Sequence, residues 1–497
     1  MLHKWLTEAT RTRGSAKALV YRDTYLSWRG LQHRVERRVQ EFGAMGIGKG
    51  HWVGLMLGNV PDFAILALAL SKIGATVVPL DPTTGTRDLS FVLDHAPLRA
   101  LITRPRGGLD ANTPSATSAA GRDWVPDARD KKNDPVESRR RLQGTLLTCS
   151  IYKQPSEPPG KAAVVLFTND SFGEPKGVLR TDENLEANAV LAAAALDVTP
   201  EDRILTTVPL YHAYGFDLGL ALALRFAATL YLEDEVAPKR IVKLLKDQEI
   251  DLLPGTPSLY AGLAKLPTAK PFKTKRARFL SGGSELPEAT MESFRQRYGL
   301  KLIPVYHTTE TGMIACDRKA GTTTAAGTVG KVIEGVELRL GDGGEVALGM
   351  TAPLWVRSKA CARLRVGAPQ RPRGEDTPVG ATDSHGWLRV GDTGHLDKAG
   401  RLFLDGREDH LVKVDGKRVA LDEVEGCLES FPKVQSARVR VVSDPLGGPM
   451  MVASVVVFAR SKCGAEELID HCARNLAPYK VPRRIEFCES LPDTVHG

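Results

Sequence analysis

The strongest restriction on the fold comes from the first hundred residues, where short apolar runs alternate with segments of helical length. Residues 52–57, 75–80 and 99–103 are rich in apolar side chains, and residues 61–74 begin with Pro and end with Gly. Apolar strands joined by helices are typical of a parallel sheet that is covered on both faces. We therefore predict an α/β protein whose large N-terminal domain contains parallel sheets covered by helices, with a smaller β subdomain.

Two polar stretches interrupt this alternation. Residues 104–160 are rich in Pro, Gly and charged side chains and predict an excursion over the surface. Its basic run at 139–141 is interpreted as a solvated face without a function. Strand–helix alternation resumes at about residue 161, and a second polar stretch covers residues 368–386.

A smaller unit follows Gly406. Asp415 and Gly416 stand between two apolar-rich runs, which is a strong signal for a β-hairpin. Asp422, with Glu425 three residues later, resembles a helix-capping pair. The remaining elements expected here are strands over 434–442 and 450–459 and a helix over 465–476. We predict an N-terminal domain of residues 1–408 and a small, mobile α+β C-terminal domain of residues 409–497.

Composition limits the class of protein. The net charge of +8 over 497 residues suits acidic partners such as nucleotides, CoA or an acidic carrier protein. No zinc-finger spacing or aromatic-plus-basic pattern points to nucleic acid. The longest apolar stretches, 63–70 and 218–224, are too short to insert in a membrane, and the first residues lack the apolar core of a signal peptide. Seven cysteines without a CxxC pair favour reduced thiols, so we predict a cytoplasmic protein of unknown oligomeric state.

A candidate phosphate-binding loop lies within residues 164–181, VVLFTNDSFGEPKGVLRT. A strand ends near Thr168, hydroxyl groups and Gly173 follow, and Lys176 adds a positive charge. A helix is expected to be capped at Thr181 or Asp182, which would offer backbone N–H groups to an anion. The loop is not of the Walker A type, because no Gly-Lys-Ser/Thr follows the glycines. Taken alone, it slightly favours an ordinary strand–helix connection with an exposed Lys.

The order of motifs along the chain resembles that of the adenylate-forming superfamily of acyl- and aryl-CoA ligases, luciferases and peptide-synthetase adenylation domains. The resemblance is closest to the acyl- and aryl-CoA ligases and covers essentially the whole chain. The motifs that carry it are TNDSFGEPKGV (168–178), VPLYHAYGF (208–216), SGGSEL (281–286), YHTTETG (306–312), GTVGKVIEGVELRL (327–340) and GWLRVGDTGHLDKAGRLFLDGREDHLVKVDGKRVALDEVE (386–425).

The resemblance implies an ATP site. Its loop would hold the β- and γ-phosphates, Thr309 would contact the α-phosphate, and Glu310 would bind Mg²⁺ through a carboxylate oxygen. Asp392 would accept hydrogen bonds from the ribose hydroxyls, with Arg407 beside it. Catalytic roles would fall to Glu310, His212 and Lys176. The full set of residues expected at ATP or AMP is Thr168, Ser171, Gly173, Lys176, Gly283, Ser284, Tyr306, Thr309, Asp392 and Arg407.

The resemblance also implies an acyl pocket and a moving domain. The pocket residues would be His212, Phe216, Gly283 and His307, and His212 would gate the path of the thiol. An alternative interpretation of His212 is a hydrogen-bonded core residue. Asp409 would be the hinge about which the small domain rotates between two poses. Gly416 and Arg418 would lie on the face that turns inward for the thiol step.

Three departures from the family pattern stand out. In the phosphate loop, Asp170 and Phe172 replace small residues, which predicts weaker ATP binding or a loop that closes differently. His307 stands where the family usually has Gly, which favours a small or aromatic acid. The sequence ends at LPDTVHG, one residue before the position of the usual catalytic Lys, and we expect the natural chain to continue.

The function predicted from these motifs is ATP-dependent activation of a carboxylic acid to acyl-AMP, followed by transfer to a phosphopantetheine thiol. The cofactors implied are ATP, Mg²⁺ and CoA, and the enzyme would be an AMP-forming acid–thiol ligase. Carrier-protein phosphopantetheine is the alternative acceptor. A degenerate member that binds nucleotide or acyl-adenylate without efficient turnover is a second alternative. A luciferase-like oxygenase shares the motifs, but no feature of the sequence favours it.

Overall fold

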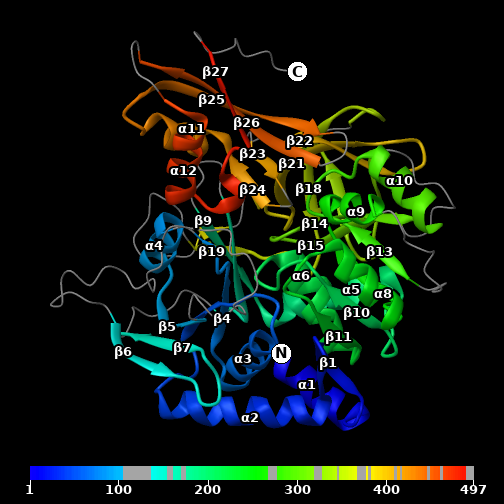
Figure 1. The fold of residues 1–497 in the computed structure, drawn as a ribbon. Helices are drawn as coiled ribbons and strands as arrows, with labels where there is room; N and C mark the ends of the chain where they lie inside the picture. Colours follow the sequence, from blue (N-terminus) through cyan, green and yellow to red (C-terminus); the bar gives the residue numbers. More distant parts are fainter. Residues whose placement is uncertain are drawn as a thin grey trace.

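The computed structural model describes residues 1–84, 86–104, 136–153, 161–169, 175–266, 277–317, 327–343, 346–366, 377–378, 382–407, 411–414, 417–444, 448–458 and 463–488. Figure 1 shows a large domain built on two sheets, with the small C-terminal domain above it. The helices α1 (Leu2–Arg13) and α2 (Trp28–Ala44) lie at the opposite end of the molecule from the small domain. The predicted α/β class with a large and a small domain is confirmed.

The first sheet has nine strands in the order β20-β19-β9-β8-β4-β3-β5-β7-β6. Its centre is the predicted parallel unit, in which β3 pairs in parallel with both β4 and β5. Helix α3 (Pro61–Ile73) follows β3 and is buried along eight consecutive residues, so it is enclosed within the domain. The strands are β3 (Trp52–Met56), β4 (Thr76–Leu80), β5 (Leu98–Thr103), β6 (Val136–Arg141), β7 (Thr148–Tyr152), β8 (Val164–Asn169), β9 (Pro175–Arg180), β19 (Leu364–Val366) and β20 (Thr377–Pro378).

The polar stretch 104–160 was predicted to be a surface excursion throughout, and this is wrong for part of it. Strands β6 and β7 form an antiparallel hairpin at the edge of the sheet, and β7 pairs with β5. The basic run 139–141 lies in β6, the edge strand of this sheet, and all three of its residues are exposed. Residues 105–135 and 154–160 lie outside the described part of the chain. Helix α4 (Thr86–His95) was not predicted.

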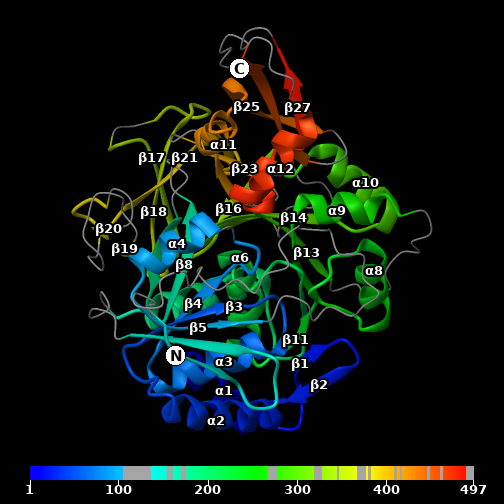
Figure 2. The same cartoon turned by 60° about the vertical axis from the view of Figure 1, so that its left-hand side comes forward.

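The second sheet has thirteen strands in the order β17-β18-β21-β22-β16-β15-β14-β13-β12-β10-β11-β1-β2. Strands β10 to β14 form its parallel part, and the antiparallel part begins at β15. Helices α8 (Pro238–Asp247), α9 (Pro257–Ala264) and α10 (Glu288–Tyr298) lie on one side of it (Figures 1 and 2). The strands are β1 (Lys17–Tyr21), β2 (Thr24–Ser27), β10 (Arg203–Thr206), β11 (Thr229–Leu232), β12 (Leu252–Gly255), β13 (Arg278–Ser281), β14 (Leu302–Thr308), β15 (Gly312–Cys316), β16 (Thr328–Val332), β17 (Glu337–Leu340), β18 (Ala352–Arg357), β21 (Leu388–Leu396) and β22 (Leu402–Arg407).

The candidate phosphate loop connects two strands rather than a strand and a helix, which corrects the prediction. Strands β8 and β9 form an antiparallel hairpin in which Thr168 pairs with Lys176. Helix α5 (Asp182–Leu196) begins only after β9. Thr181 caps it as predicted, since its hydroxyl accepts from the backbone N–H of Asn184. The helix N-terminus is therefore separated from the loop by the whole of β9.

The small domain has its own hydrophobic core. The predicted hairpin is present as β23 (Leu411–Val414) and β24 (Lys417–Ala420). Helix α11 (Leu421–Glu429) already begins before Asp422, so the predicted cap at Asp422 is wrong. Glu425 instead accepts from the backbone N–H of Val439, 2.7 Å away. The other elements are β25 (Val434–Asp444), β26 (Gly448–Val457), α12 (Ala465–Asn475) and β27 (Arg484–Phe487).

All seven cysteines are free thiols, as the scattered spacing predicted. No helix within the described residues has the length and apolar character needed to cross a membrane.

Candidate active site

Two turns bring the predicted catalytic charges together. Lys176 is the second residue of β9 in the β8–β9 hairpin, and Glu310 lies in the turn between β14 and β15. Lys176 Nζ is 3.7 Å from Glu310 Oε1, and the two side chains are 13% and 6% exposed. The ammonium group of Lys176 is suited to bind a phosphate oxygen, and the carboxylate of Glu310 is suited to bind a metal ion. The nearly buried pair brings both groups to the same place in the structure.

The residues predicted at the ribose lie on three strands of the thirteen-stranded sheet, β14, β21 and β22. The Tyr306 hydroxyl, on β14, donates a hydrogen bond to Asp392 Oδ2, on β21. Both side chains are buried. Arg407 of β22 stands opposite Asp392 in the strand register. The carboxylate is therefore held in a fixed orientation by a neighbour that is itself one of the predicted ATP-binding residues.

The turn after β13 depends on glycine. Gly283 has φ +90°, in the left-handed region that side chains disfavour. A Cβ on Gly282 would lie 2.9 Å from the ring of Tyr214. The SGGSEL segment thus needs its two glycines for a sharp turn and for close approach to Tyr214. Ser284 follows directly, at the position where the resemblance expects a nucleotide contact.

The segment with His212 and Phe216 is an unusual helix. His212 precedes α6 (Ala213–Gly215), and its Nδ1 accepts from the backbone N–H of Tyr214 at 3.3 Å. The chain continues as the π-helix η1 (Phe216–Ala221), in which every residue is buried. Such π-helical turns are frequent at functional sites. Phe216 is fully buried, whereas His212 is partly exposed and lines a cavity.

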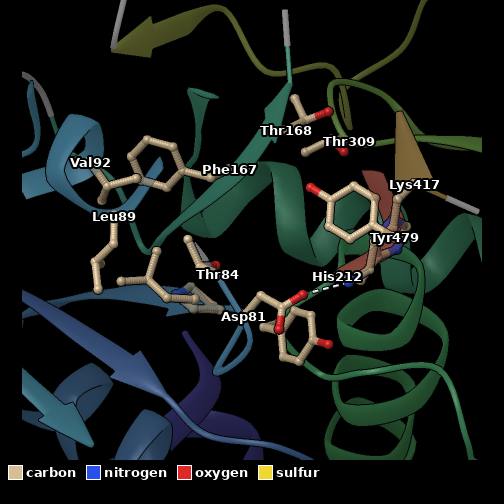
Figure 3. Close-up of a pocket in the computed structure, with 13 residues that line it drawn as sticks. Asp81, Thr84, Leu89, Val92, Phe167, Thr168, His212, Thr309, Lys417 and Tyr479 are labelled. Carbon is tan, nitrogen blue, oxygen red and sulfur yellow. Dashed lines mark hydrogen bonds and ion pairs between the residues drawn. The ribbon is translucent and has the colours of Figure 1, made fainter. Parts of the chain in front are cut away.

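A cavity of about 100 Å³ joins several of these parts (Figure 3). One side is apolar, with Leu89 and Val92 of α4 beside Phe167. The other side is polar and includes residues of the small domain. The lining residues that the sequence had singled out are Thr168, His212 and Thr309. The hairpin of the small domain therefore reaches the immediate neighbourhood of the predicted acyl and phosphate sites.

Two lining residues that the sequence analysis missed connect the domains. Lys417 of β24 forms an ion pair with Asp81, which directly follows β4. Lys417 also lies over the rings of Tyr479 and Tyr211, 4.3 and 5.4 Å from their centroids. Burial and the Asp81 carboxylate raise the pKa of Tyr211 well above its ordinary value. A lone Asp after a strand and a Lys in a hairpin carry no local signal, so only the three-dimensional arrangement reveals this contact.

A second missed feature is a buried charged network behind Thr309. His307 Nε2 is 2.9 Å from Asp217 Oδ2, and Arg180 Nη1 is 3.1 Å from the same oxygen. Burial alone would raise the pKa of Asp217, but Arg180 and the His307 hydrogen bond lower it below its ordinary value. His307 also contacts the Tyr214 ring edge-on, with centroids 5.7 Å apart. An arginine and an aspartate inside otherwise apolar segments were the signals available in the sequence.

Some predicted site residues are not described. Asp170, Ser171, Phe172 and Gly173 of the phosphate loop, the hinge Asp409, and Gly416 lie outside the described residues. For Arg407 and Arg418, only the strand positions are described. Within the described part of the chain, no group of three or more His, Cys, Asp or Glu side chains is arranged to hold a metal.

Comparison with known proteins gives concordant results for both domains. A family model described as AMP-binding enzyme matches residues 6–364, and one described as AMP-binding enzyme C-terminal domain matches residues 423–497. The 2-succinylbenzoate–CoA ligase of Listeria innocua is 26% identical over 498 residues, which cover 99% of this chain and 97% of that protein. The indoleacetate–CoA ligase of Aromatoleum aromaticum is 26% identical over 503 residues, covering 100% and 96%. Among solved structures, a mutant of the amide bond synthetase McbA from Marinactinospora thermotolerans matches with a TM-score of 0.79 at 26% identity, covering 99% of this chain and 97% of that one.

Proposed function

Because the chain belongs to the AMP-binding enzyme family, we propose that it activates a carboxylic acid with ATP and transfers the acyl group to the thiol of CoA. The family predicted from the order of motifs is confirmed. The observation that carries the proposal is the Lys176–Glu310 pair, 3.7 Å apart and nearly buried, beside Thr309. A carboxylate oxygen of the substrate attacks the α-phosphorus of ATP, and pyrophosphate leaves. The thiolate then attacks the acyl carbon, and AMP leaves.

The residues present fit a nucleotide with a single Mg²⁺. Glu310 supplies one carboxylate, and Mg²⁺ in phosphate-transfer sites is commonly held by one or two carboxylates together with phosphate oxygens. When bound, the ion neutralises phosphate charge. Lys176 interacts with a phosphate oxygen as a point charge, and hydroxyl groups are offered by Thr168 of β8 and by Thr309 of the turn between β14 and β15. Asp392, oriented by Tyr306, accepts hydrogen bonds from the ribose.

The two steps use two poses of the small domain. We place the domain boundary at 408/409 and the hinge at Asp409, and the thiol-step face includes Gly416 and Arg418. The contact of Lys417 with Asp81 supports a pose in which the hairpin lies against the cavity containing His212. In that pose His212 is a gate on the path of the thiol. Hinge closure of this kind assembles a site while excluding water.

The nature of the acid follows from the pocket rather than from relatives. Two relatives are named for a succinylbenzoate and for indoleacetate, so their names do not define one acid. Here His307 and Phe216 are buried where an acyl chain would extend, which favours a small or aromatic acid over a long chain. CoA is the preferred acceptor. A carrier-protein phosphopantetheine is the second choice.

The test is a screen for acid-dependent pyrophosphate release, followed by thioester formation with CoA or with a phosphopantetheinylated carrier protein. The expected result is pyrophosphate release with at least one aryl or short-chain acid and a CoA thioester as the product. If nucleotide binds but no acid releases pyrophosphate, the chain is a degenerate binder and the proposal is wrong. Whether a thioester forms with CoA or with the carrier protein identifies the acceptor.

A further inference from the structure

A hollow lined by basic side chains lies at the end of the large domain opposite the small domain. It has a volume of about 420 Å³, and its walls are residues of α2, the first residues of α3, the residue after β5, and the turn between β6 and β7. Figure 1 shows α2 along this end of the molecule and the hairpin of the small domain toward the other end. None of the lining residues belongs to the cavity that contains His212, so the hollow is separate from the candidate active site.

The basic side chains at this hollow outnumber the acidic ones. Arg34 and Arg37 lie one turn apart on α2, and Arg104 directly follows β5. His33 of α2 adds an imidazole. All four side chains are exposed, so a ligand can reach them from the solvent. Asp62 is the one acidic residue among the described residues that line the hollow, and the three arginines form no ion pair within the described part of the chain.

The two main walls of the hollow are joined by hydrogen bonds between α2 and the β6–β7 turn. Arg38 Nη2 donates to the backbone carbonyl of Gln143 at 3.0 Å, and the Gln143 backbone N–H donates to Glu41 Oε1 at 2.8 Å. Arg38 and Glu41 also pair with each other, and their side chains are 13% and 12% exposed. The charge of Arg38 is therefore balanced inside the wall, whereas Arg34 and Arg37 remain available to a ligand.

The charge at the hollow matches a phosphate group better than a carboxylate. Arginines around one hollow repel one another unless a negative group lies between them, and a guanidinium has planar donors that fit phosphate oxygens. Three arginines and Asp62 leave two positive charges. A phosphate monoester carries about −1.5 to −2 at pH 7, whereas a carboxylate carries a single charge.

Apolar side chains complete the lining. Ile65 of α3 and Leu147 of the turn border the hollow, and Leu146 beside them is 56% exposed. A ligand can therefore place its phosphate against the arginines and an apolar part against these side chains. Ligand sites commonly combine apolar walls with a few polar groups that fix the orientation.

We propose that this hollow is a binding site for a phosphate-bearing ligand, whose phosphate oxygens accept hydrogen bonds from Arg34, Arg37 and Arg104. The ligand is a soluble phosphate compound or the headgroup of an anionic lipid, since both present the same group to the arginines. The proposal does not rest on the proposed function, because the hollow shares no residue with the candidate active site.

The experiment measures binding of two phosphate sources to the full chain. The soluble probe is inositol hexakisphosphate, which carries phosphate monoesters but no purine or ribose for the nucleotide site, and calorimetry follows its binding. The lipid probe is a vesicle of equal parts phosphatidylcholine and phosphatidic acid, compared in co-sedimentation with a vesicle of phosphatidylcholine alone.

The test variant is Arg34→Gln with Arg37→Gln, because glutamine has nearly the helix propensity of arginine but no charge. The control variant is Lys243→Gln with Lys246→Gln. These lysines are exposed on α8 at the same spacing, so the control changes the net charge equally at a place outside the hollow.

We expect at least one source to bind to the wild-type chain and to the control, and to bind the Arg34 and Arg37 double variant about tenfold more weakly or worse, because hydrogen bonds to a charged group are lost. Binding of inositol hexakisphosphate assigns the site to a soluble phosphate compound. Binding of the phosphatidic acid vesicles alone assigns it to a lipid headgroup. Failure of both sources to bind, or equal affinities of the two double variants, would overturn the proposal.

Discussion

Lys417 of the small domain and Asp81 of the large domain form an ion pair, although 336 positions separate them in the sequence. The two side chains are 22% and 13% exposed, so solvent screens the pair less than an ordinary surface pair. The Tyr479 ring lies 4.3 Å from the Lys417 ammonium and adds a cation–π contact. These contacts hold the β23–β24 hairpin against the cavity that contains His212.

Replacement of Lys417 by Met should slow the thiol step more than the adenylation step. Loss of a half-buried ion pair and a cation–π contact corresponds to about 1–2 kcal/mol, or roughly 5–30-fold in the population of this pose. Thioester formation from supplied acyl-AMP, measured in a single turnover, should fall by that factor. The control is Lys433→Met, because Lys433 pairs with Glu467 within the small domain and does not reach the large one. Equal slowing of the two half-reactions would contradict this role of Lys417.

Replacement of Glu310 by Gln should slow acyl-AMP formation by about a hundredfold or more, because one preorganised charge at the reacting phosphate is removed. The amide retains the shape of the side chain but no longer pairs with Lys176 as an ion. Pyrophosphate release at saturating ATP, followed across a Mg²⁺ titration, measures the effect. Glu292→Gln on the exposed surface of α10 is the matched control. Release at the wild-type rate would remove Glu310 from the catalytic site.

The sequence predicted the helices and strands of the N-terminal parallel unit and of the small domain, because their apolar periodicity is strong. Motif resemblance assigned Lys176 and Glu310 to one expected ATP site, but it did not predict the ion pair between them. The sequence did not predict β9 between the phosphate loop and α5, since a strand of six residues with Pro, Lys and Gly has little strand character. Asp217, Arg180 and Asp81 were missed because their roles arise from partners at least 37 residues away in sequence. Contacts between distant segments leave no local pattern.

Replacement of Tyr306 by Phe should weaken ATP binding without abolishing turnover. The Tyr306 hydroxyl orients the Asp392 carboxylate, and one hydrogen bond to a charged group corresponds to about 1.5–3 kcal/mol. We expect the KM for ATP to rise by roughly 10-fold or more, with a smaller change in the KM for the acid. Tyr298→Phe is the control for loss of a buried hydroxyl, because the Tyr298 hydroxyl donates a hydrogen bond to a backbone carbonyl remote from the site. A change confined to the KM for the acid would assign Tyr306 to the acyl pocket instead.

The phosphate loop should bind ATP more tightly when its two unusual residues are replaced. Asp170 adds a negative charge to a phosphate-binding segment, and Phe172 is bulky where related loops are small. The double replacement Asp170→Gly and Phe172→Thr removes the repulsion and restores backbone freedom. We expect a several-fold lower KM for ATP in steady-state pyrophosphate release. An unchanged or higher KM would mean that the native loop is adapted to a different closed geometry.

Replacement of Arg180 by Met should destabilise the protein in a pH-dependent manner. In the native protein, Arg180 and the hydrogen bond with His307 lower the pKa of buried Asp217. These contacts therefore stabilise the folded protein at pH values above the ordinary carboxyl pKa. Their contribution is lost as the pH falls through the lowered pKa of Asp217. In the variant, burial dominates and raises the pKa of Asp217, so protonation on acidification relieves the penalty. Urea unfolding should show a loss of about 3–5 kcal/mol at pH 7, the usual cost of breaking a buried pair, and a smaller loss near pH 4. The exposed Arg295→Met variant should show little loss at either pH. A loss for Arg180→Met that is constant from pH 7 to pH 4 would mean that Asp217 is uncharged in the native network.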